Sequence, residues 1–133
     1  MALERIVSGG QTGVDRGALD AALARGFPCG GWCPEGRLVE DGAIPERYPV
    51  TELSGAGYPE RTLRNVLDSD ATAILAFGTL EGGSALTREL CVEHGKPHLV
   101  IDAESTSPKR AAALLRRFLD EHAIRVLNVA GPR

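Results

Sequence analysis

The chain has 133 residues, the length of one typical domain, and its 15 Lys and Arg against 18 Asp and Glu give a net charge of -3. This balance offers no basic excess for binding a nucleic acid polymer or an anionic membrane surface. No apolar run approaches the roughly 20 residues that span a bilayer, and no signal pattern opens the chain, so we expect a soluble, cytoplasmic protein.

The first part of the chain reads as a strand, a glycine loop and a helix. Residues 3–7 are a short apolar, β-branched run, and SGGQTG follows at residues 8–13. Apolar residues then recur at helical spacing from Val14 to Leu23, and Gly26 supplies a stop. A short second strand is expected at residues 28–32. Residues 34–59 show no periodicity and are rich in Pro, Gly and charge, which favours a long functional loop.

The second part alternates between helices and strands. A helix is expected over residues 58–70, a buried strand at 71–77 (ATAILAF), a helix at 84–94, a strand at 98–101, a helix at 108–122 and a last strand at 124–129. Such alternation predicts right-handed crossovers. The expected fold is α/β, a three-layer αβα Rossmann-like sandwich with a mainly parallel sheet of about five strands, forming one domain over residues 1–133.

Two glycine loops, each between a strand and a helix, form the candidate ligand site. Ligands of open parallel sheets bind beyond the carboxyl ends of the strands, where helix N-termini present free N–H groups. The residues expected to bind are Gly9, Gly10, Gln11, Thr12 and Gly13 in the first loop, and Gly82, Gly83, Ser84 and Thr87 in the second. A tight strand-to-helix turn is the alternative for the first loop.

The motifs narrow the ligand class. Neither loop has the dinucleotide spacing G-x-G-x-x-G or a P-loop Lys, which points away from NAD chemistry and ATP hydrolysis and toward a nucleotide-like or oxyanion-bearing ligand. Cys29 and Cys33 lack the second ligand pair of a zinc site, so no metal site is readable. The three cysteines, an odd number, are expected to be reduced thiols.

The helix expected at residues 58–70 carries a cation in an unusual place. Its apolar face is expected to be Leu63, Val66 and Leu67, so that Arg61, Arg64, Asn65 and Asp68 lie nearer to the exposed face. Arg61 falls at the start of the helix, where a cation opposes the helix dipole. An anionic ligand is a physical reason for an arginine at that position.

Four stretches together resemble a known family. GGQTGVDRGALDAA, CPEGRLVEDGAIPERYPVTEL, RTLRNVLDSDATAILAFGTLEGGSALT and GKPHLVID are similar to the putative molybdenum carrier family, within the Lonely-Guy (LOG)-like, or SLOG, Rossmannoid superfamily. The similarity covers about residues 6–102, and NVAGPR at 128–133 is also in keeping. It implies a phosphorylated small-molecule ligand, either a nucleotide or the molybdenum cofactor (molybdopterin), and a homo-oligomer, dimer or tetramer.

The resemblance also implies a second possible function. In LOG-type phosphoribohydrolases an Arg on this helix and a Glu on the next act on the ribose of a nucleoside 5′-monophosphate, and Arg61 and Glu89 match these catalytic residues by spacing. The sequence departs from that pattern at Thr62, where those enzymes carry Lys, at Glu81, where they carry Pro, and at residues 85–86, where they carry Gly-Thr. Three functions therefore stay open: a ligand carrier, an N-glycosidic hydrolase, and an interaction domain with an empty site.

Overall fold

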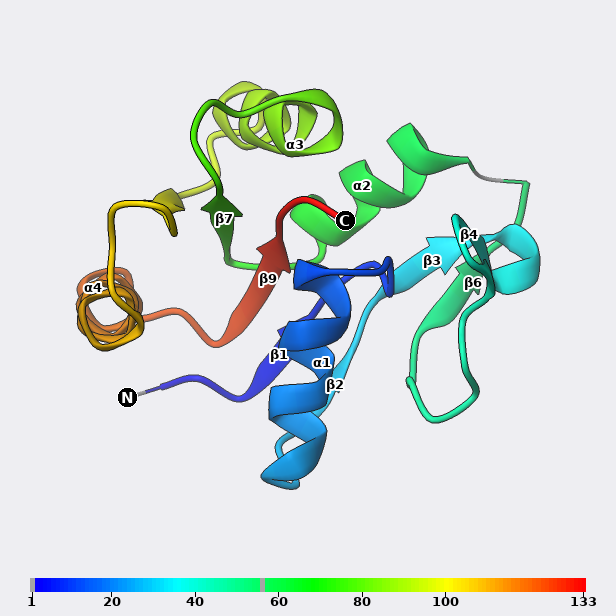
Figure 1. The fold of residues 1–133 in the computed structure, drawn as a ribbon, viewed down its shortest axis with the longest axis horizontal. Helices are drawn as coiled ribbons and strands as arrows, with labels where there is room; N and C mark the ends of the chain where they lie inside the picture. The colour runs from blue at the N-terminus through cyan, green and yellow to red at the C-terminus, as the bar shows by residue number, and fades with distance from the viewer. Residues whose placement is uncertain (1, 56) are drawn as a thin grey trace.

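The computed structural model describes residues 2–55 and 57–133 and is built on one five-stranded sheet (Figure 1). All pairings within this sheet are parallel, and the strands lie in the order β2 (Cys29–Gly30), β1 (Arg5–Val7), β9 (Val126–Ala130), β7 (Ala71–Ala76) and β8 (His98–Asp102). The last strand of the chain therefore occupies the middle of the sheet, between β1 and β7.

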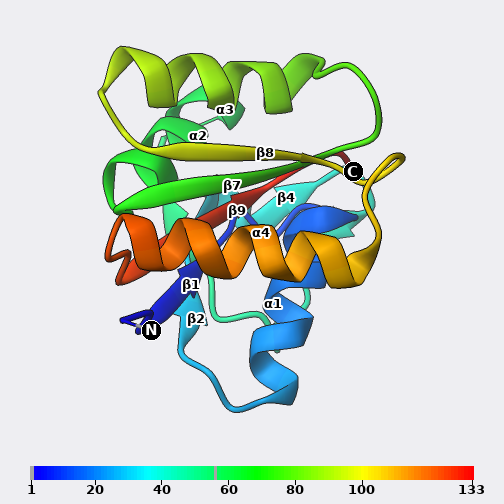
Figure 2. The same ribbon diagram turned by 90° about the vertical axis from the view of Figure 1, so that its left-hand side faces the viewer.

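Helices cover both faces of the sheet. α1 (Val14–Ala24) and α4 (Pro108–Glu121) lie on one face, whereas α2 (Tyr58–Leu67) and α3 (Gly82–Glu93) lie on the other (Figure 2). The chain passes from β1 through α1 to β2 in one direction, and from β7 through α3 to β8 in the opposite direction. Right-handed crossovers then place α1 and α3 on opposite faces. The three-layer αβα sandwich expected from the sequence is confirmed.

One hydrophobic core lies between the sheet and α4. Alternate residues of β7, Ala71 and Ala73, pack with Leu127 of β9 against Phe118 and Leu119 of α4, and all of them are buried. The residues between them point to the opposite face, as the period of a strand requires. Among residues 2–55 and 57–133, no helix combines the length and the apolar character that a membrane span requires.

The stretch without sequence periodicity contains short strands in place of the expected long loop. β3 (Trp32–Pro34) pairs in parallel with β6 (Thr51–Leu53), and β4 (Leu38–Val39) pairs antiparallel with β5 (Gly42–Ala43), after a 3-10 turn at Glu35–Arg37. The Arg37 guanidinium organises this region by donating hydrogen bonds of 2.8 to 3.2 Å to the backbone oxygens of Ile44, Pro45, Tyr48 and Val50. Because one side chain satisfies these carbonyls, the segment needs no regular ladder or periodic pattern.

α2 departs from its predicted hydrophobic pattern at two positions, although Val66 is buried as expected. Leu67, expected in the core, is 40% exposed, whereas Asn65, expected nearer to solvent, is buried. The Asn65 side chain accepts a hydrogen bond from the Trp32 N–H at 2.8 Å and donates one to the Trp32 carbonyl at 3.0 Å. Pairing both backbone groups of Trp32 outweighs the burial of one leucine, because buried polar groups left unpaired are costly.

Asn65→Ala should therefore destabilise the protein by about 2–3 kcal/mol, since it leaves the N–H and the carbonyl of Trp32 unpaired in the interior. Urea denaturation measures this difference in the free energy of unfolding. Arg116→Ala, on the exposed side of α4, is the control and should stay within about 0.5 kcal/mol of the parent. Equal unfolding midpoints for the two variants would show that Asn65 does not hold β3.

Candidate functional site

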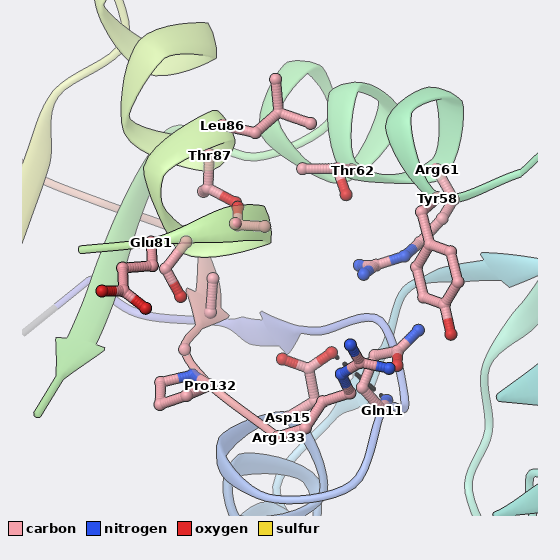
Figure 3. Close-up of a pocket in the computed structure, with 15 residues that line it drawn as sticks. Gln11, Asp15, Tyr58, Arg61, Thr62, Glu81, Leu86, Thr87, Pro132 and Arg133 are labelled. Carbon is pink, nitrogen blue, oxygen red and sulfur yellow. Dashed lines mark hydrogen bonds between the residues drawn. The ribbon is translucent and has the colours of Figure 1, made fainter. Parts of the chain in front are cut away.

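A cavity of about 610 Å³ opens at the carboxyl-terminal edge of the sheet, a volume typical of small-molecule sites (Figure 3). α1, α2 and α3 all begin beside it, and the residues that follow β9 close it. The lining residues are Gln11, Asp15, Tyr58, Arg61, Thr62, Glu81, Gly82, Gly83, Ser84, Leu86, Thr87, Ala130, Gly131, Pro132 and Arg133. Because helix N-termini carry unpaired N–H groups and the positive end of the dipole, this arrangement favours an anionic ligand.

The cavity brings together part of the expected site. Both glycine loops reach it, and the expected residues that line it are Gln11, Arg61, Gly82, Gly83, Ser84 and Thr87. Gly9, Gly10, Thr12 and Gly13 lie outside this lining. Glu89 also lies outside it, on an exposed part of α3 beyond the turns that border the cavity.

Two glycines of the first loop allow other groups to pack closely against the backbone. A Cβ atom at Gly9 would overlap the Arg61 guanidinium, so the absence of a side chain at Gly9 creates the space that Arg61 occupies. Gly13 has φ of 80°, and a Cβ atom there would lie 2.5 Å from the carbonyl oxygen of Pro132. The first loop is therefore a packing surface for Arg61 and for the segment after β9.

Arg61 and Asp15 place opposite charges in the wall of the cavity. Burial lowers the pKa of Arg61, and the negative charge of Asp15 opposes this effect. Burial likewise raises the pKa of Asp15, against the charge of Arg61 and hydrogen bonds from Gln11, Ser8 and Gly9. The two charges attract each other without a direct ion pair, since no nitrogen of Arg61 lies within 4.0 Å of the Asp15 carboxylate. An anion can therefore compete with Asp15 for the guanidinium.

Three buried polar atoms in this wall have no hydrogen-bond partner among the residues that the structure describes. They are Nε2 and Oε1 of Gln11 and Nε of Arg61. A buried polar atom left unpaired costs about 1–3 kcal/mol, and native proteins contain few of them. No other buried side-chain nitrogen or oxygen in the described part of the chain is unpartnered, so the unpaired groups concentrate in this one cavity.

A profile of the circularly permutated YpsA SLOG family matches residues 6–133. The chain belongs to this family. A crystal structure of a protein from Syntrophus aciditrophicus SB, titled putative molybdenum carrier protein, superposes with a TM-score of 0.96 at 49% sequence identity. The match covers 99% of this chain and 84% of that chain, which confirms the resemblance expected from the sequence. A search of curated proteins finds no match.

In this member of the permutated YpsA family, residues 130–133 form a cavity wall that the sequence analysis did not predict. The Val14 N–H, at the start of α1, donates to the Pro132 carbonyl at 3.1 Å. A Cβ atom at Gly131 would lie 2.8 Å from the Leu75 carbonyl, so only glycine fits between β7 and α1. A Gly-Pro pair directly after an apolar strand was the available signal. Its place in the cavity wall follows from the position of β9 in the middle of the sheet.

Asp15→Asn should stabilise this SLOG protein at neutral and higher pH. Because the pKa of Asp15 is raised in the folded state, its contribution to stability is present below the ordinary carboxyl range and is lost as the pH rises through the folded-state pKa. The variant, which carries no charge there, should gain roughly 1 kcal/mol at pH 8 and nothing at pH 3.5. Urea denaturation across this range measures the gap, and a gap that is constant with pH would contradict the account.

Proposed function

We propose that this protein is a small-molecule carrier that binds a phosphorylated ligand of the nucleotide type in the cavity between α1, α2 and α3. The observation that carries the proposal is the cluster of unpaired buried atoms on Gln11 and Arg61. Folding leaves these groups without partners, and a ligand toward which the Gln11 and Arg61 side chains turn recovers that cost as affinity. The Arg61 guanidinium and the helix N-termini match the charge of a phosphate group.

We extend the proposal to the molybdenum cofactor as the carried ligand, because the solved relative is named a putative molybdenum carrier protein. A phosphorylated pterin has the chemistry that this wall fits, because its phosphate can accept from Arg61 and its ring edge can pair with Gln11. In the part of the chain that the structure describes, no three His, Cys, Asp or Glu side chains are grouped as metal ligands are. The proposal therefore concerns the organic part of such a cofactor.

Hydrolysis of a nucleoside 5′-monophosphate is less well supported by this geometry. The reaction needs a carboxylate within hydrogen-bond reach of the sugar. Glu89, which matches the hydrolase pattern by spacing, lies outside the cavity lining. The carboxylates within the lining are those of Asp15 and Glu81. A catalytic role for Arg61 and Glu89 stays a prediction, tested by the release of ribose 5-phosphate and its loss in Glu89→Gln.

Gly83→Leu tests whether the cavity binds the ligand. Gly83 lines the cavity, and a Cβ atom there meets nothing within 4 Å, so a leucine side chain would occupy ligand space without disturbing the fold. Binding of inosine or adenosine 5′-monophosphate, measured by calorimetry, should weaken by at least about tenfold. Gly17→Leu is the matched control, since Gly17 is helical, equally unobstructed and outside the cavity lining. Equal affinities of the two variants would count against this cavity.

Two further expectations belong to the proposal. The resemblance implies a homo-oligomer, dimer or tetramer, and the sequence predicts a cytoplasmic protein whose charge balance disfavours binding to nucleic acid polymers and membranes. Both stay predictions. Sedimentation equilibrium measures the first, and fractionation of the native host cell measures the second.

A further inference from the structure

Gln11 differs from the other polar residues of the cavity because its whole side-chain amide is unpaired. The residue is 4% exposed, and neither Nε2 nor Oε1 has a partner among the residues described. Whichever way the amide is oriented, it presents one acceptor and two donor hydrogens in a single plane. A complete ligand must therefore offer Gln11 both a donor and an acceptor.

The backbone of Gln11 is fixed at both ends. Its N–H donates to the Asp15 carboxylate at 3.3 Å, and its carbonyl accepts from the Arg16 N–H at 3.1 Å. Arg16 is itself held, because it donates to the Gly10 carbonyl at 3.1 Å and pairs with Asp41 at 2.9 Å. The loop therefore fixes the backbone of Gln11 beside the cavity before a ligand arrives, which lowers the entropy cost of binding.

An oxyanion without a hydroxyl group cannot complete this site. Molybdate offers only acceptor oxygens, which suit Nε of Arg61 and Nε2 of Gln11 but leave Oε1 of Gln11 without a donor. An unpaired buried acceptor retains its desolvation cost. The ligand must therefore carry an N–H or O–H donor beside an acceptor.

An aromatic ring lies on the same side of the cavity as Gln11. Figure 3 shows Tyr58 and Arg61 reaching from α2 toward Gln11, while the start of α3 forms the opposite wall. The Arg61 guanidinium lies 5.7 Å from the centre of the Tyr58 ring. An aromatic face next to a planar donor and acceptor pair is the surface that recognises a planar heterocycle, by stacking and by edge hydrogen bonds.

Resting on the proposed function, we infer that Gln11 reads the edge of a heterocyclic ligand through paired hydrogen bonds, beside the ring of Tyr58. The edge that fits presents an N–H donor next to a nitrogen or oxygen acceptor, as purine bases with an amino or oxo group and pterins do. Gln11 thus sets specificity for the ring system, whereas Arg61 and the start of α3 bind the anionic group.

The test combines a ligand series with one substitution. Calorimetry on the full chain compares inosine 5′-monophosphate, adenosine 5′-monophosphate, 6-hydroxymethylpterin phosphate and purine riboside 5′-monophosphate, whose base has acceptors but no donor. We expect the last to bind at least about tenfold more weakly than the best of the others, the loss of one buried hydrogen-bond pair. Gln11→Met should weaken the best ligand by about 10- to 100-fold and should weaken purine riboside 5′-monophosphate by less, because that base can form only one of the paired hydrogen bonds with Gln11. Thr51→Val, at an exposed position outside the cavity lining, is the control.

The outcomes separate this inference from the proposed function. Nucleotide binding without discrimination, or equal affinities before and after Gln11→Met, would overturn the role of Gln11 and leave the carrier proposal standing. Binding of free phosphate or molybdate as tight as that of every organic ligand would also overturn it. No binding of any phosphorylated ligand would overturn both. Whether the tightest ligand is a purine nucleotide or the pterin decides the source of the heterocycle.

Discussion

Arg61→Met should weaken the binding of inosine or adenosine 5′-monophosphate by about 100-fold. Arg61 brings a cation with an unpaired buried donor to the cavity, and a charge-assisted hydrogen bond to a phosphate group in such surroundings contributes up to about 3 kcal/mol. Arg64→Met is the matched control, because Arg64 lies one turn further along α2, is exposed and bonds to Asp68. Calorimetry should find the binding of the control variant unchanged.

The same substitution separates binding from folding. Removing the Arg61 charge leaves Asp15 buried without its nearest compensating cation, so Arg61→Met should also lower the unfolding midpoint. The double variant Asp15→Asn, Arg61→Met removes both charges and should regain stability without regaining affinity. A double variant that binds nucleotide as the parent does would contradict the role of Arg61, as would equal affinities of Arg61→Met and Arg64→Met.

Gly31→Ala should lower the free energy of unfolding by about 3 kcal/mol or more, a large effect for the addition of one methyl group. Gly31 joins β2 to β3 at φ of 130°, and a Cβ atom there would overlap the backbone oxygen of Ser8. The Ser8 N–H donates to Gly30 at 2.9 Å, and the Gly31 carbonyl accepts from Thr51 at 2.8 Å, so no backbone shift can relieve the overlap without breaking strand pairing.

Gly26→Ala provides the comparison for this glycine. Gly26 also has positive φ, of 61°, but a Cβ atom there meets nothing within 4 Å. Only backbone strain remains, about 1 kcal/mol. Thermal unfolding and soluble yield should both be clearly lower for Gly31→Ala than for Gly26→Ala. Coincident melting curves would mean that the approach of Gly31 to Ser8 carries no steric cost.

The alternation of strands and helices was readable because glycines and prolines mark its boundaries. The expected strand at residues 71–77 matches β7 to within one residue, and Ser107 caps α4 by accepting from the Arg110 N–H at 3.1 Å. Hydrogen bonds from side chains to distant backbone were not readable. Arg37 and Asn65 satisfy backbone groups elsewhere in the fold, and hydrophobic periodicity carries no information about such pairings.

The candidate site was predicted in outline and differs in detail. The position of Arg61 against the helix dipole indicated an anionic ligand, and the structure brings that residue to the cavity with Gln11 and the start of α3. Glu89 was placed by spacing alone. Because α3 begins at Gly82, Glu89 lies about two turns into the helix, beyond the residues that line the cavity. The wall at residues 130–133 depends on the order of strands in the sheet, which no local pattern reports.

The most direct test is a titration of isotopically labelled protein with inosine 5′-monophosphate, followed by amide NMR spectra. Ligand binding in this cavity should give saturable shifts of the Gln11 side-chain amide and of the backbone amides of Gly83 and Ser84, residues that all line the cavity. The Gly17 amide, outside the lining, should not move. Saturable shifts that spare Gln11, Gly83 and Ser84, or a spectrum unchanged by nucleotide and by hydroxymethylpterin phosphate alike, would contradict ligand binding in this cavity.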